Sequence, residues 1–424
     1  MVTSESPGLL IPKAGVDLGR PDTYADGVPY EVFARLRREA PVSWVDEPPH
    51  DGFDGGPGFW AATRHADIVE VSRHPEVYSS HVGATFLRDQ RPRDLAALQQ
   101  MMLNLDPPDH SKLRKIVSRV FTPKMVNGMF SSIARDAHDI VAGLEPGSEI
   151  DLVAKVSAEM PLMVLADLLG VPRSDRHLLY SWTNRMVGLD DPAYGGRAAF
   201  LSAFQEMFAY AEEQAEMRRR DPGDDVWSLI VNAEVDGERL SLDELQRFFQ
   251  LLMIAGNETT RNLLTGAVLT LDRHPDQWAE LRANPDLLEG AIEEILRFHP
   301  PVMQFRRTAV ADAELGGQRI AAGDKVVVFY VSGNRDESVF SDPDRFDIHR
   351  NPVNHLAFGS GTHFCLGNSL ARLEARVLLT ELFARFPRMR VAGPSLRFRS
   401  NFINGYRELP VELGPAAART APEE

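Results

Sequence analysis

A long run of helical pattern in the middle of the chain is the strongest constraint on the fold. Ser241-Leu242-Asp243-Glu244 has the form of a capping box, in which serine and glutamate side chains each accept a backbone N–H at a helix start. Apolar residues then recur at helical spacing to about Leu271. A helix over this stretch has about 31 residues and, at about 1.5 Å per residue, a length of about 46 Å. We therefore expect one helix that crosses the whole protein.

Helical pattern dominates the chain around this helix, and strands gather toward the two ends. Residues 109–284 are nearly all helical in pattern, whereas residues 42–45, 58–63, 303–308 and 325–331 have the character of strands. A further helix is expected from about Leu366 to Phe386, before a strand-rich tail. No repeat or long linker divides the 424 residues. We predict a single α+β domain, predominantly α, over residues 1–424, with flexible ends at about 1–20 and 414–424.

Charge and hydropathy exclude several classes of partner. The formal net charge is −15, and the short basic run Arg218 to Arg220 is interpreted as a solvated helix end, so we expect no nucleic-acid partner. The best apolar stretch, around Met160 to Val171, is interrupted by Asp167 and is too short to span a bilayer. The N-terminus has no signal-peptide pattern. We expect a cytoplasmic protein without a membrane anchor.

The chain has one cysteine, Cys365, which excludes a disulfide framework and any zinc or iron–sulfur site that needs several thiolates. It lies in F-G-S-G-T-H-F-C-L-G, Phe358 to Gly367, directly before a helical pattern. A helix N-terminus is expected to lower the pKa of the thiol and favour the thiolate. A lone thiolate on a glycine-rich loop suits ligation of haem iron at one point. The alternative is a small buried hydrophobic residue beside a tight turn.

The segment Phe358 to Gly367 resembles the haem-binding signature of the cytochrome P450 superfamily, the haem-thiolate monooxygenases, and the resemblance extends from about Tyr24 to Leu413. It implies a single P450 fold, with the long central helix over haem b and small β-sheets. It also implies that Cys365 is the proximal iron ligand, that Phe358 packs beside its sulfur, and that His363 contacts a haem propionate. The residues that the resemblance places at the haem are His110, Arg114, Ala255, Gly256, Thr259, Arg307, Phe358, Gly359, His363, Cys365 and Gly367.

The middle of the long helix contains L-L-M-I-A-G-N-E-T-T, Leu251 to Thr260. Gly256 weakens the helix, and Thr259 or Thr260 can bond back to a carbonyl one turn earlier, so a local bend is expected. Neighbouring residues point about 100° apart, so the Glu258 carboxylate and the Thr259 hydroxyl can face bulk water and a cavity respectively. The alternative is a bend whose threonines are satisfied by the backbone. The resemblance implies that Thr259 and Glu258 deliver protons for the cleavage of dioxygen, although many relatives carry aspartate at position 258.

Two further motifs support the resemblance. Glu294 and Arg297 stand three residues apart on one helix face and, taken alone, would form an exposed ion pair. The resemblance implies instead a buried pair that is joined by Arg345 and holds the cysteine loop. His110 and Arg114 stand four apart in D-P-P-D-H-S-K-L-R and, together with Arg307, are implied to bind the haem propionates. Arg306 is expected to point the other way by strand alternation.

The resemblance also indicates a substrate and a source of electrons. By family position, the pocket residues are Ile254, Ala255, Val302, Met303, Phe305, Phe402 and Ile403, in addition to the regions Ser80 to Met102 and Tyr180 to Tyr194; core packing is the alternative role for each. Several stretches are similar to actinobacterial members that hydroxylate steroids, terpenoids or methyl-branched lipids. No flavin or nicotinamide domain is visible, so dioxygen chemistry would draw electrons from an external ferredoxin and its reductase, and only indirectly from NAD(P)H. Lys112 and Arg372 are candidates for the charge that docks the ferredoxin.

Other activities are open to a haem-thiolate chain. A peroxide-driven enzyme, an isomerase or dehydratase, and a haem-based sensor or carrier are the alternatives. The intact Glu258–Thr259 pair favours a monooxygenase that acts on a hydrophobic small molecule.

Overall fold

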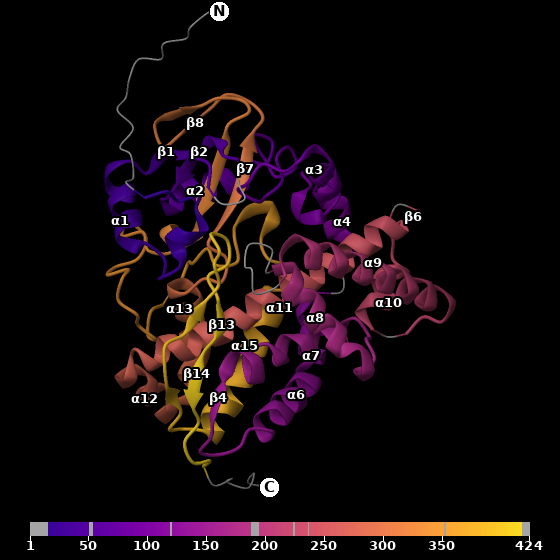
Figure 1. Ribbon diagram of the computed structural model, residues 1–424, viewed down its shortest axis with the longest axis vertical. Coiled ribbons are helices and arrows are strands. Elements are labelled where there is room, and N and C mark those ends of the chain that lie inside the picture. Colours follow the sequence, from indigo (N-terminus) through magenta and orange to yellow (C-terminus); the bar gives the residue numbers. More distant parts are fainter. Residues whose placement is uncertain are drawn as a thin grey trace, which may run out of the picture.

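The computed structural model describes residues 16–50, 54–118, 121–187, 195–223, 225–235, 237–351 and 353–417. Its central element is α11 (Leu242–Asp272), a continuous helix of 31 residues that crosses the middle of the molecule (Figure 1). The capping box predicted from Ser241 and Glu244 is present, with the serine hydroxyl accepting from the Glu244 N–H at 3.2 Å. The sequence therefore predicted both the existence and the length of the main helix.

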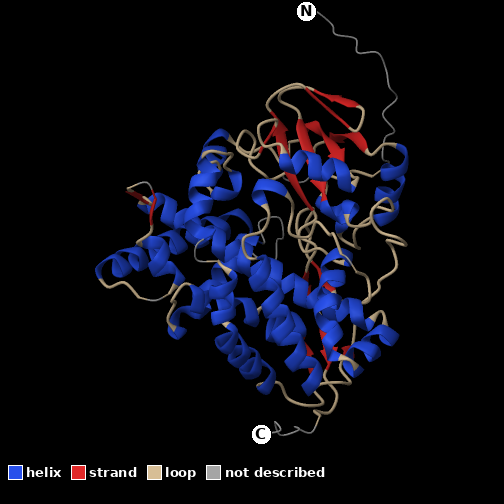
Figure 2. Ribbon diagram, turned by 180° about the vertical axis from the view of Figure 1, so that it is seen from behind, coloured by secondary structure: helices blue, strands red, loops and turns tan. Residues whose placement is uncertain are grey.

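Helices fill the larger part of the molecule, and a sheet occupies the opposite end (Figure 2). The other helices are α1 (Tyr30–Glu39), α2 (His65–Arg73), α3 (Pro92–Leu98), α4 (Asp109–Ser118), α5 (Pro123–Gly128), α6 (Phe130–Ala142), α7 (Glu159–Leu168), α8 (Arg176–Val187), α9 (Gly196–Arg220), α10 (Val226–Val231), α12 (Pro275–Ala283), α13 (Leu288–Phe298), α14 (Tyr330–Gly333) and α15 (Asn368–Arg385). The strands are β1 (Val42–Glu47), β2 (Gly56–Ala62), β3 (Tyr78–Ser79), β4 (Glu149–Asp151), β5 (Glu234–Val235), β6 (Glu238–Arg239), β7 (Gln304–Ala309), β8 (Ala313–Leu315), β9 (Gln318–Ile320), β10 (Lys325–Phe329), β11 (Arg390–Val391), β12 (Leu396–Arg397), β13 (Tyr406–Glu408) and β14 (Pro410–Glu412).

The main hydrophobic core surrounds α11. Most α11 side chains from Leu263 onward are buried, because this half of the helix is enclosed by other elements. Gly256 brings α11 close to α7, since a Cβ at this position would lie 2.8 Å from the Leu165 side chain. The glycine in the middle of the helix thus has a packing reason, which offsets its low helix propensity.

The five-stranded sheet has the order β1-β2-β10-β7-β3, and β10 is buried on both faces. Val327 and Phe329 of β10 join one hydrophobic cluster, while Val326 and Val328 join another, as the alternation of side chains in a strand requires. Strand β7 pairs antiparallel with β10, so Arg307 lies opposite Val326. The sheet therefore fixes the position of the two arginines in β7.

Several boundaries differ from the sequence expectation. The stretch 109–284 is interrupted by β4, β5 and β6, which are too short to show an alternating pattern and depend on partner strands; β4, for example, pairs with β14. The predicted strand over 325–331 ends at Phe329, where α14 begins. The predicted helix from about Leu366 begins two residues later, at Asn368.

The run Arg218 to Arg220 is a solvated helix end at Arg219 and Arg220, as expected, but not at Arg218. Arg218 is buried and donates to Gln214 at 2.6 Å and to the Gly170 carbonyl at 2.6 Å, whereas Arg220 is exposed. Arg218 reaches the Leu169 and Gly170 carbonyls, which directly follow α7, so consecutive arginines meet different environments.

The predicted flexible ends are only partly described. Residues 1–15 and 418–424 lie outside the described residues. Within the described part, Leu18 is buried and its carbonyl accepts from the Tyr24 hydroxyl, while Ala417 N donates to the Arg385 carbonyl at 2.9 Å. Residues 16–20 and 414–417 are therefore packed against the body of the protein.

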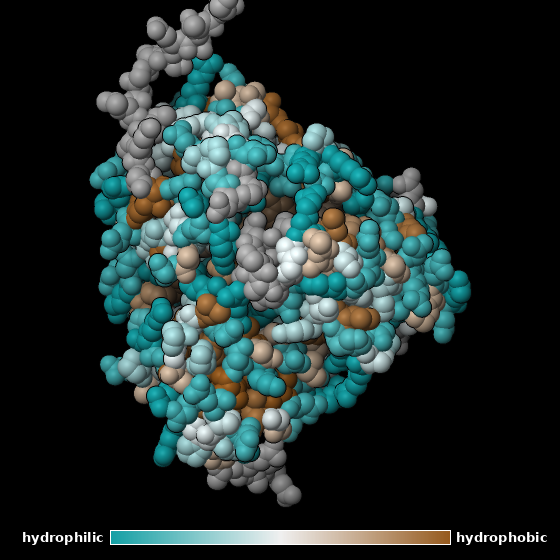
Figure 3. Space-filling model, viewed as in Figure 1, coloured by the Kyte–Doolittle hydropathy of each residue, from teal (hydrophilic) through white to brown (hydrophobic). Residues whose placement is uncertain are grey.

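The surface is mainly hydrophilic. Hydrophilic side chains cover most of the face shown in Figure 3, with hydrophobic side chains scattered among them. Across the described residues, no helix combines the length and the apolar character that crossing a bilayer requires.

Candidate functional site

The cysteine loop is a tight turn between α14 and α15. Gly359 and Gly361 have φ values of 71° and 67°, a conformation that favours glycine. Gly361 also passes so close to the end of α2 that a Cβ there would lie 2.1 Å from the Ser72 carbonyl oxygen. Cys365 N donates to the Phe358 carbonyl at 2.9 Å, and the Asn368 side chain donates to the Cys365 carbonyl at 2.8 Å. The loop therefore holds the cysteine in one fixed position.

The expected effect on the thiol is wrong in direction. Burial raises the pKa of Cys365, and it outweighs the lowering effects of the Gly367 N–H, Arg114 and Arg372. The helix N-terminus acts weakly because α15 starts at Asn368, beyond the cysteine. A metal cation deprotonates a coordinating thiol by itself, so a low pKa is not needed for ligation.

Four nitrogen-bearing side chains gather next to this loop. They come from α4, β7 and the loop itself, and they are His110, Arg114, Arg307 and His363. The rings of His110 and His363 lie 4.2 Å apart between centroids, and Arg114 donates to the Phe364 carbonyl at 2.5 Å. Burial, with Arg307, His110 and Arg114 nearby, holds the pKa of His363 well below its ordinary value.

Within the described part of the chain, no carboxylate forms a direct ion pair with this cluster, and the charge of Asp106 acts on Arg307 and His110 only through space. Arg307 is 4% exposed and donates to the Arg306 carbonyl at 2.8 Å, yet it forms no ion pair within the described part of the chain. His110 Nδ1 is buried and has no hydrogen-bond partner among the described residues. Buried cations are normally paired, so this donor set suits anions from outside the chain. The residues present therefore fit the two carboxylates of a haem. Arg306 points away as expected and pairs with Asp89 at 2.6 Å.

The middle of α11 presents one open face. Ala255 is exposed and Thr259 is half-buried, while Asn257, Glu258 and Thr260 are buried. The Thr259 hydroxyl donates to the Ala255 carbonyl at 2.6 Å, which confirms the predicted bond to the preceding turn. An exposed alanine halfway along the central helix indicates an accessible space beside it, and the Thr259 hydroxyl lies at that space.

Glu258 does not face bulk water, contrary to expectation. Its carboxylate is 1% exposed and pairs with Arg261 at 2.8 Å. Burial raises the pKa of Glu258, and the charge of Arg261 opposes this shift. Arg261 in turn donates to Asn184 of α8, so protein rather than water covers the side of α11 that carries this ion pair.

Comparison with known proteins agrees with this geometry. The sequence profile of the family described as Cytochrome P450 matches residues 197–389. The linalool 8-monooxygenase of Pseudomonas putida is 42% identical over 94% of this chain and 99% of its own length. The methyl-branched lipid omega-hydroxylase of Mycobacterium tuberculosis is 43% identical over 95% of each chain.

The chain belongs to the cytochrome P450 family. Its family implies a haem with cysteine thiolate ligation and a monooxygenase activity on hydrophobic molecules. A steroid C26-monooxygenase of Rhodococcus jostii is 39% identical over 95% of this chain and 86% of its own length. Among solved structures, a Mycobacterium marinum cytochrome P450 in complex with pseudoionone superposes with a TM-score of 0.85, at 39% identity, over 96% of this P450 and 100% of that chain.

The buried ion pair of this P450 has a different third member from the one predicted. Glu294 and Arg297 are 0% exposed and pair at 2.7 Å, as expected for a buried network. Arg350, not Arg345, contacts the Glu294 carboxylate, at 3.1 Å. The Arg345 side chain is exposed and pairs with acids of its own loop, and only its carbonyl accepts from Arg297. Spacing alone could not distinguish two arginines on one irregular loop.

This network reaches the cysteine loop through the backbone. Arg297 donates to the Asn334 carbonyl at 2.8 Å, and the Asn334 side chain accepts from Leu356 N at 2.6 Å, two residues before Phe358. The sequence prediction of a network that holds this loop is thus supported by a continuous set of contacts.

A second pair beside the loop escaped the sequence analysis. Glu293 pairs with Arg372 at 2.5 Å, and the Arg372 guanidinium lies 4.4 Å from the Phe358 ring centroid. Burial would raise the pKa of Glu293, but hydrogen bonds from Arg372 and His355 hold it at about 2. We expected Arg372 to help dock a ferredoxin, but its side chain is bound to Glu293. Glu293 is the first glutamate of E-E-I-L-R, so a second acid beside Glu294 was visible in the sequence.

Most predicted substrate residues lie around the open face of α11 or at the junction of β7 and the tail. Val302 and Ile403 form an antiparallel bridge, and the Phe305 and Phe402 rings lie 5.3 Å apart. Phe86, which lies in the predicted region Ser80 to Met102 but was not singled out, contacts Phe402 at 5.5 Å. Ile254 and Ala255 lie on α11 itself.

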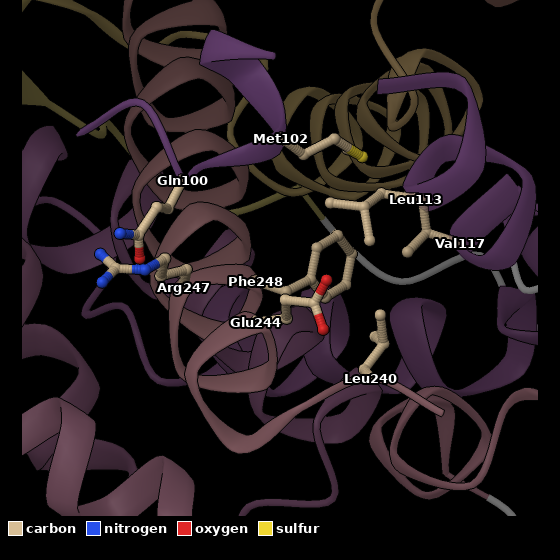
Figure 4. Close-up of a pocket in the computed structure, with 8 residues that line it drawn as sticks. All are labelled: Gln100, Met102, Leu113, Val117, Leu240, Glu244, Arg247 and Phe248. Atoms are coloured by element: carbon tan, nitrogen blue, oxygen red, sulfur yellow. The ribbon is translucent and has the colours of Figure 1, made fainter. Parts of the chain in front are cut away.

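Met303 is a correction to the predicted pocket. It is fully buried in the hydrophobic cluster that includes Val327 and Phe329, so it serves the core. Of the predicted region Tyr180 to Tyr194, residues 188–194 lie outside the described residues. A small pocket at the N-terminal end of α11 is a separate feature, because Phe248 on its wall is about 16 Å along the helix from Thr259 (Figure 4).

Proposed function

We propose that this P450 hydroxylates the terminal carbon of a methyl-branched hydrophobic chain, such as that of an acyclic terpenoid, a branched lipid or a steroid side chain. The observation that carries the catalytic assignment is the open face of α11, where the Thr259 hydroxyl borders an accessible space. The similar enzymes are named for linalool C8, the omega position of methyl-branched lipids and steroid C26. Each of these positions is the end of a methyl-branched chain.

We assign the haem to the space between the cysteine loop and α11. Cys365 would supply the thiolate ligand, and His110, Arg114, Arg307 and His363 would bind the propionates through their buried donors. When bound, haem b with a thiolate ligand supplies the oxidising chemistry that inserts one atom of dioxygen into a C–H bond.

Further residues of the cysteine loop and of the middle of α11 shape this site sterically. Gly359 gives the loop its shape through its positive φ, the Gly367 N–H bonds to Cys365, and Phe358 fixes one side of the loop through its contact with Arg372. Ala255 keeps the open face of α11 free of a bulky side chain, and Gly256 lets the helix lie close to Leu165 of α7.

Thr259 and Glu258 supply protons to this site. The hydroxyl at the open face donates to the Ala255 carbonyl and can turn to donate into the space instead. Glu258 accepts a proton on the far side of the helix and passes it on, which is general acid catalysis. Apolar side chains such as Ile254, Val302, Phe305, Phe402 and Ile403 exclude water and orient the chain end of the substrate.

Electrons come from outside the chain. We assign this role to a ferredoxin with its reductase, which draws on NAD(P)H. Lys112, on the exposed side of α4 and two residues from Arg114, is the residue that we place at the docking surface.

The experiment is a binding and turnover screen with haem-loaded protein. Linalool, a methyl-branched fatty acid and a steroid with an intact side chain are compared with their analogues that lack the terminal methyl group. We expect a spin-state change in the haem spectrum and a terminal alcohol as product, only with ferredoxin and reductase. Oxidation at ring or internal carbons would refute the terminal assignment, and equal turnover with hydrogen peroxide alone would refute the electron-transfer assignment.

A further inference from the structure

Arg261 connects the acid of the proposed proton relay to a different helix. Its Nη2 donates to Glu258 Oε2 at 2.8 Å, and its Nη1 donates to Asn184 Oδ1 on α8 at 3.1 Å. The guanidinium lies 5.1 Å from the Phe398 ring centroid, and its side chain is 3% exposed. The planar, buried Arg261 guanidinium thus links Glu258 of α11 to Asn184 of α8.

The neighbouring residues add to the same contact. Asn257, one residue before Glu258, donates to the Thr183 hydroxyl at 2.9 Å, one residue before Asn184. Glu258 Oε1, Asn257 Oδ1 and Arg261 Nε are buried, and within the described part of the chain they have no hydrogen-bond partner. Buried polar atoms of folded proteins normally bond to protein or ordered water. Ordered water between α8 and α11 could therefore bond to these three atoms beside the Glu258 carboxylate.

The arrangement holds Glu258 away from the open face of α11. Thr259 borders the accessible space, while the Glu258 carboxylate is buried and bound to Arg261, whose other terminal nitrogen donates to Asn184 of α8. To pass a proton toward Thr259, the carboxylate must loosen its bond to Arg261. Because Arg261 also bonds Asn184, the strength of that bond depends on where α8 lies.

We infer that Arg261 is a positioning residue that holds Glu258 on the α8 side of α11, and that its bond to Asn184 couples the delivery of protons to the position of α8. This inference rests on the proposed function, since it requires Glu258 to act in the relay. It adds Arg261 and Asn184 to the residues that control the relay, although neither contacts the reacting atoms. Movement of α8 would change the share of electrons that reaches product without any change in the haem-binding residues.

The first test follows Glu258 in haem-loaded protein without substrate. The infrared carbonyl band of its protonated form is obtained by subtracting the spectrum of Glu258→Gln. Arg261 donates to this carboxylate, and the Asn262 amide, one turn along α11, donates to the Glu258 carbonyl. On α8, Asn184 and Thr183 accept from Arg261 and Asn257 and thus lie one contact away from the acid. We expect Arg261→Met to shift the midpoint of the band to higher pH, because the opposing charge is gone, and Arg261→Lys to shift it less. An unchanged midpoint in Arg261→Met would overturn the inference.

The second test measures how electrons from NADPH divide between hydroxylated linalool and hydrogen peroxide. Asn184→Ala breaks the link to α8 and leaves the Glu258–Arg261 pair intact. We expect the product share to change roughly threefold or more, and the midpoint of the Glu258 band to move less than in Arg261→Met because the charge of Arg261 is retained. Ser181→Ala, an exposed position on the same helix, is the matched control and should change neither quantity. A product share in Asn184→Ala equal to that of Ser181→Ala would refute the coupling to α8.

Failure of the proton relay and failure of the positioning role give different results. If Glu258→Gln leaves the division of electrons unchanged, the relay itself is wrong. If Glu258→Gln diverts electrons to peroxide but Arg261→Lys and Asn184→Ala do not, the relay stands and the positioning role of Arg261 is wrong.

Discussion

Glu374 is a buried acid whose removal should stabilise the protein. It lies on α15, is 3% exposed, and is surrounded on the helix by the buried Leu370, Leu373 and Leu378. Its Oε2 has no hydrogen-bond partner among the described residues. Burial raises the pKa of Glu374 from 4.5 to about 8. At neutral pH the folded protein therefore holds this carboxyl group protonated, whereas the unfolded chain ionises it.

The size of the effect follows from this difference. Below pH 4.5 both states are protonated and Glu374 costs nothing through ionisation. As the pH rises, the unfolded chain releases the proton first, so stability falls by about 1.4 kcal/mol per pH unit until the folded state also ionises. The loss is on the order of 3 kcal/mol at pH 7 and 5 kcal/mol above pH 8. We predict that Glu374→Gln, which cannot ionise, removes this loss.

The assay is denaturant unfolding of haem-loaded wild type and Glu374→Gln at pH 5, pH 7 and pH 8.5. The variant should gain stability over wild type progressively from the lowest to the highest pH. Glu381→Gln, a half-exposed position on the same helix, is the control and should show a small difference at all three. A difference between Glu374→Gln and wild type that does not grow with pH would refute the reasoning.

Three further predictions concern the retention of haem. Arg297→Ala leaves Glu294 buried without its partner, a loss on the order of 3–5 kcal/mol, and should give little haem-loaded protein, whereas Arg345→Ala should load normally; equal haem content in the two would contradict the network. Gly361→Ala places a Cβ 2.1 Å from the Ser72 carbonyl oxygen at a positive φ, so the absorbance ratio of haem to protein should fall sharply, and a normal ratio would show that the loop can shift. Arg307→Ala should speed the transfer of haem to apomyoglobin at least tenfold, because a buried charged hydrogen bond contributes about 1.5–3 kcal/mol. An unchanged transfer rate would show that Arg307 does not bind a propionate.

The sequence predicted what local pattern and signature can specify. The capping box at Ser241 and the apolar periodicity after it gave the full length of α11, because both are properties of neighbouring residues. Cys365, His363, His110 and Arg307 were expected near one site from motifs that lie far apart in the chain, and the structure places the three nitrogen-bearing side chains beside the cysteine loop.

The sequence predictions were wrong where tertiary packing determines the partner, direction or burial of a side chain. Arg350 and Arg345 are indistinguishable by spacing, and only the course of the loop brings Arg350 to Glu294. The direction of Glu258 depended on whether α8 or water covers that side of α11, which helix geometry alone cannot tell. The thiol pKa was misjudged because the loop buries Cys365 and the helix begins farther along the chain.

The central claim is that the sulfur of Cys365 binds haem iron. The most direct measurement is the absorption spectrum of freshly prepared, haem-replete protein after reduction and exposure to carbon monoxide, with Cys365→His as the comparison. The account predicts the red-shifted Soret band that is characteristic of thiolate opposite carbon monoxide, and its loss in the variant. A wild-type spectrum without that band, identical to the spectrum of Cys365→His, would contradict the claim.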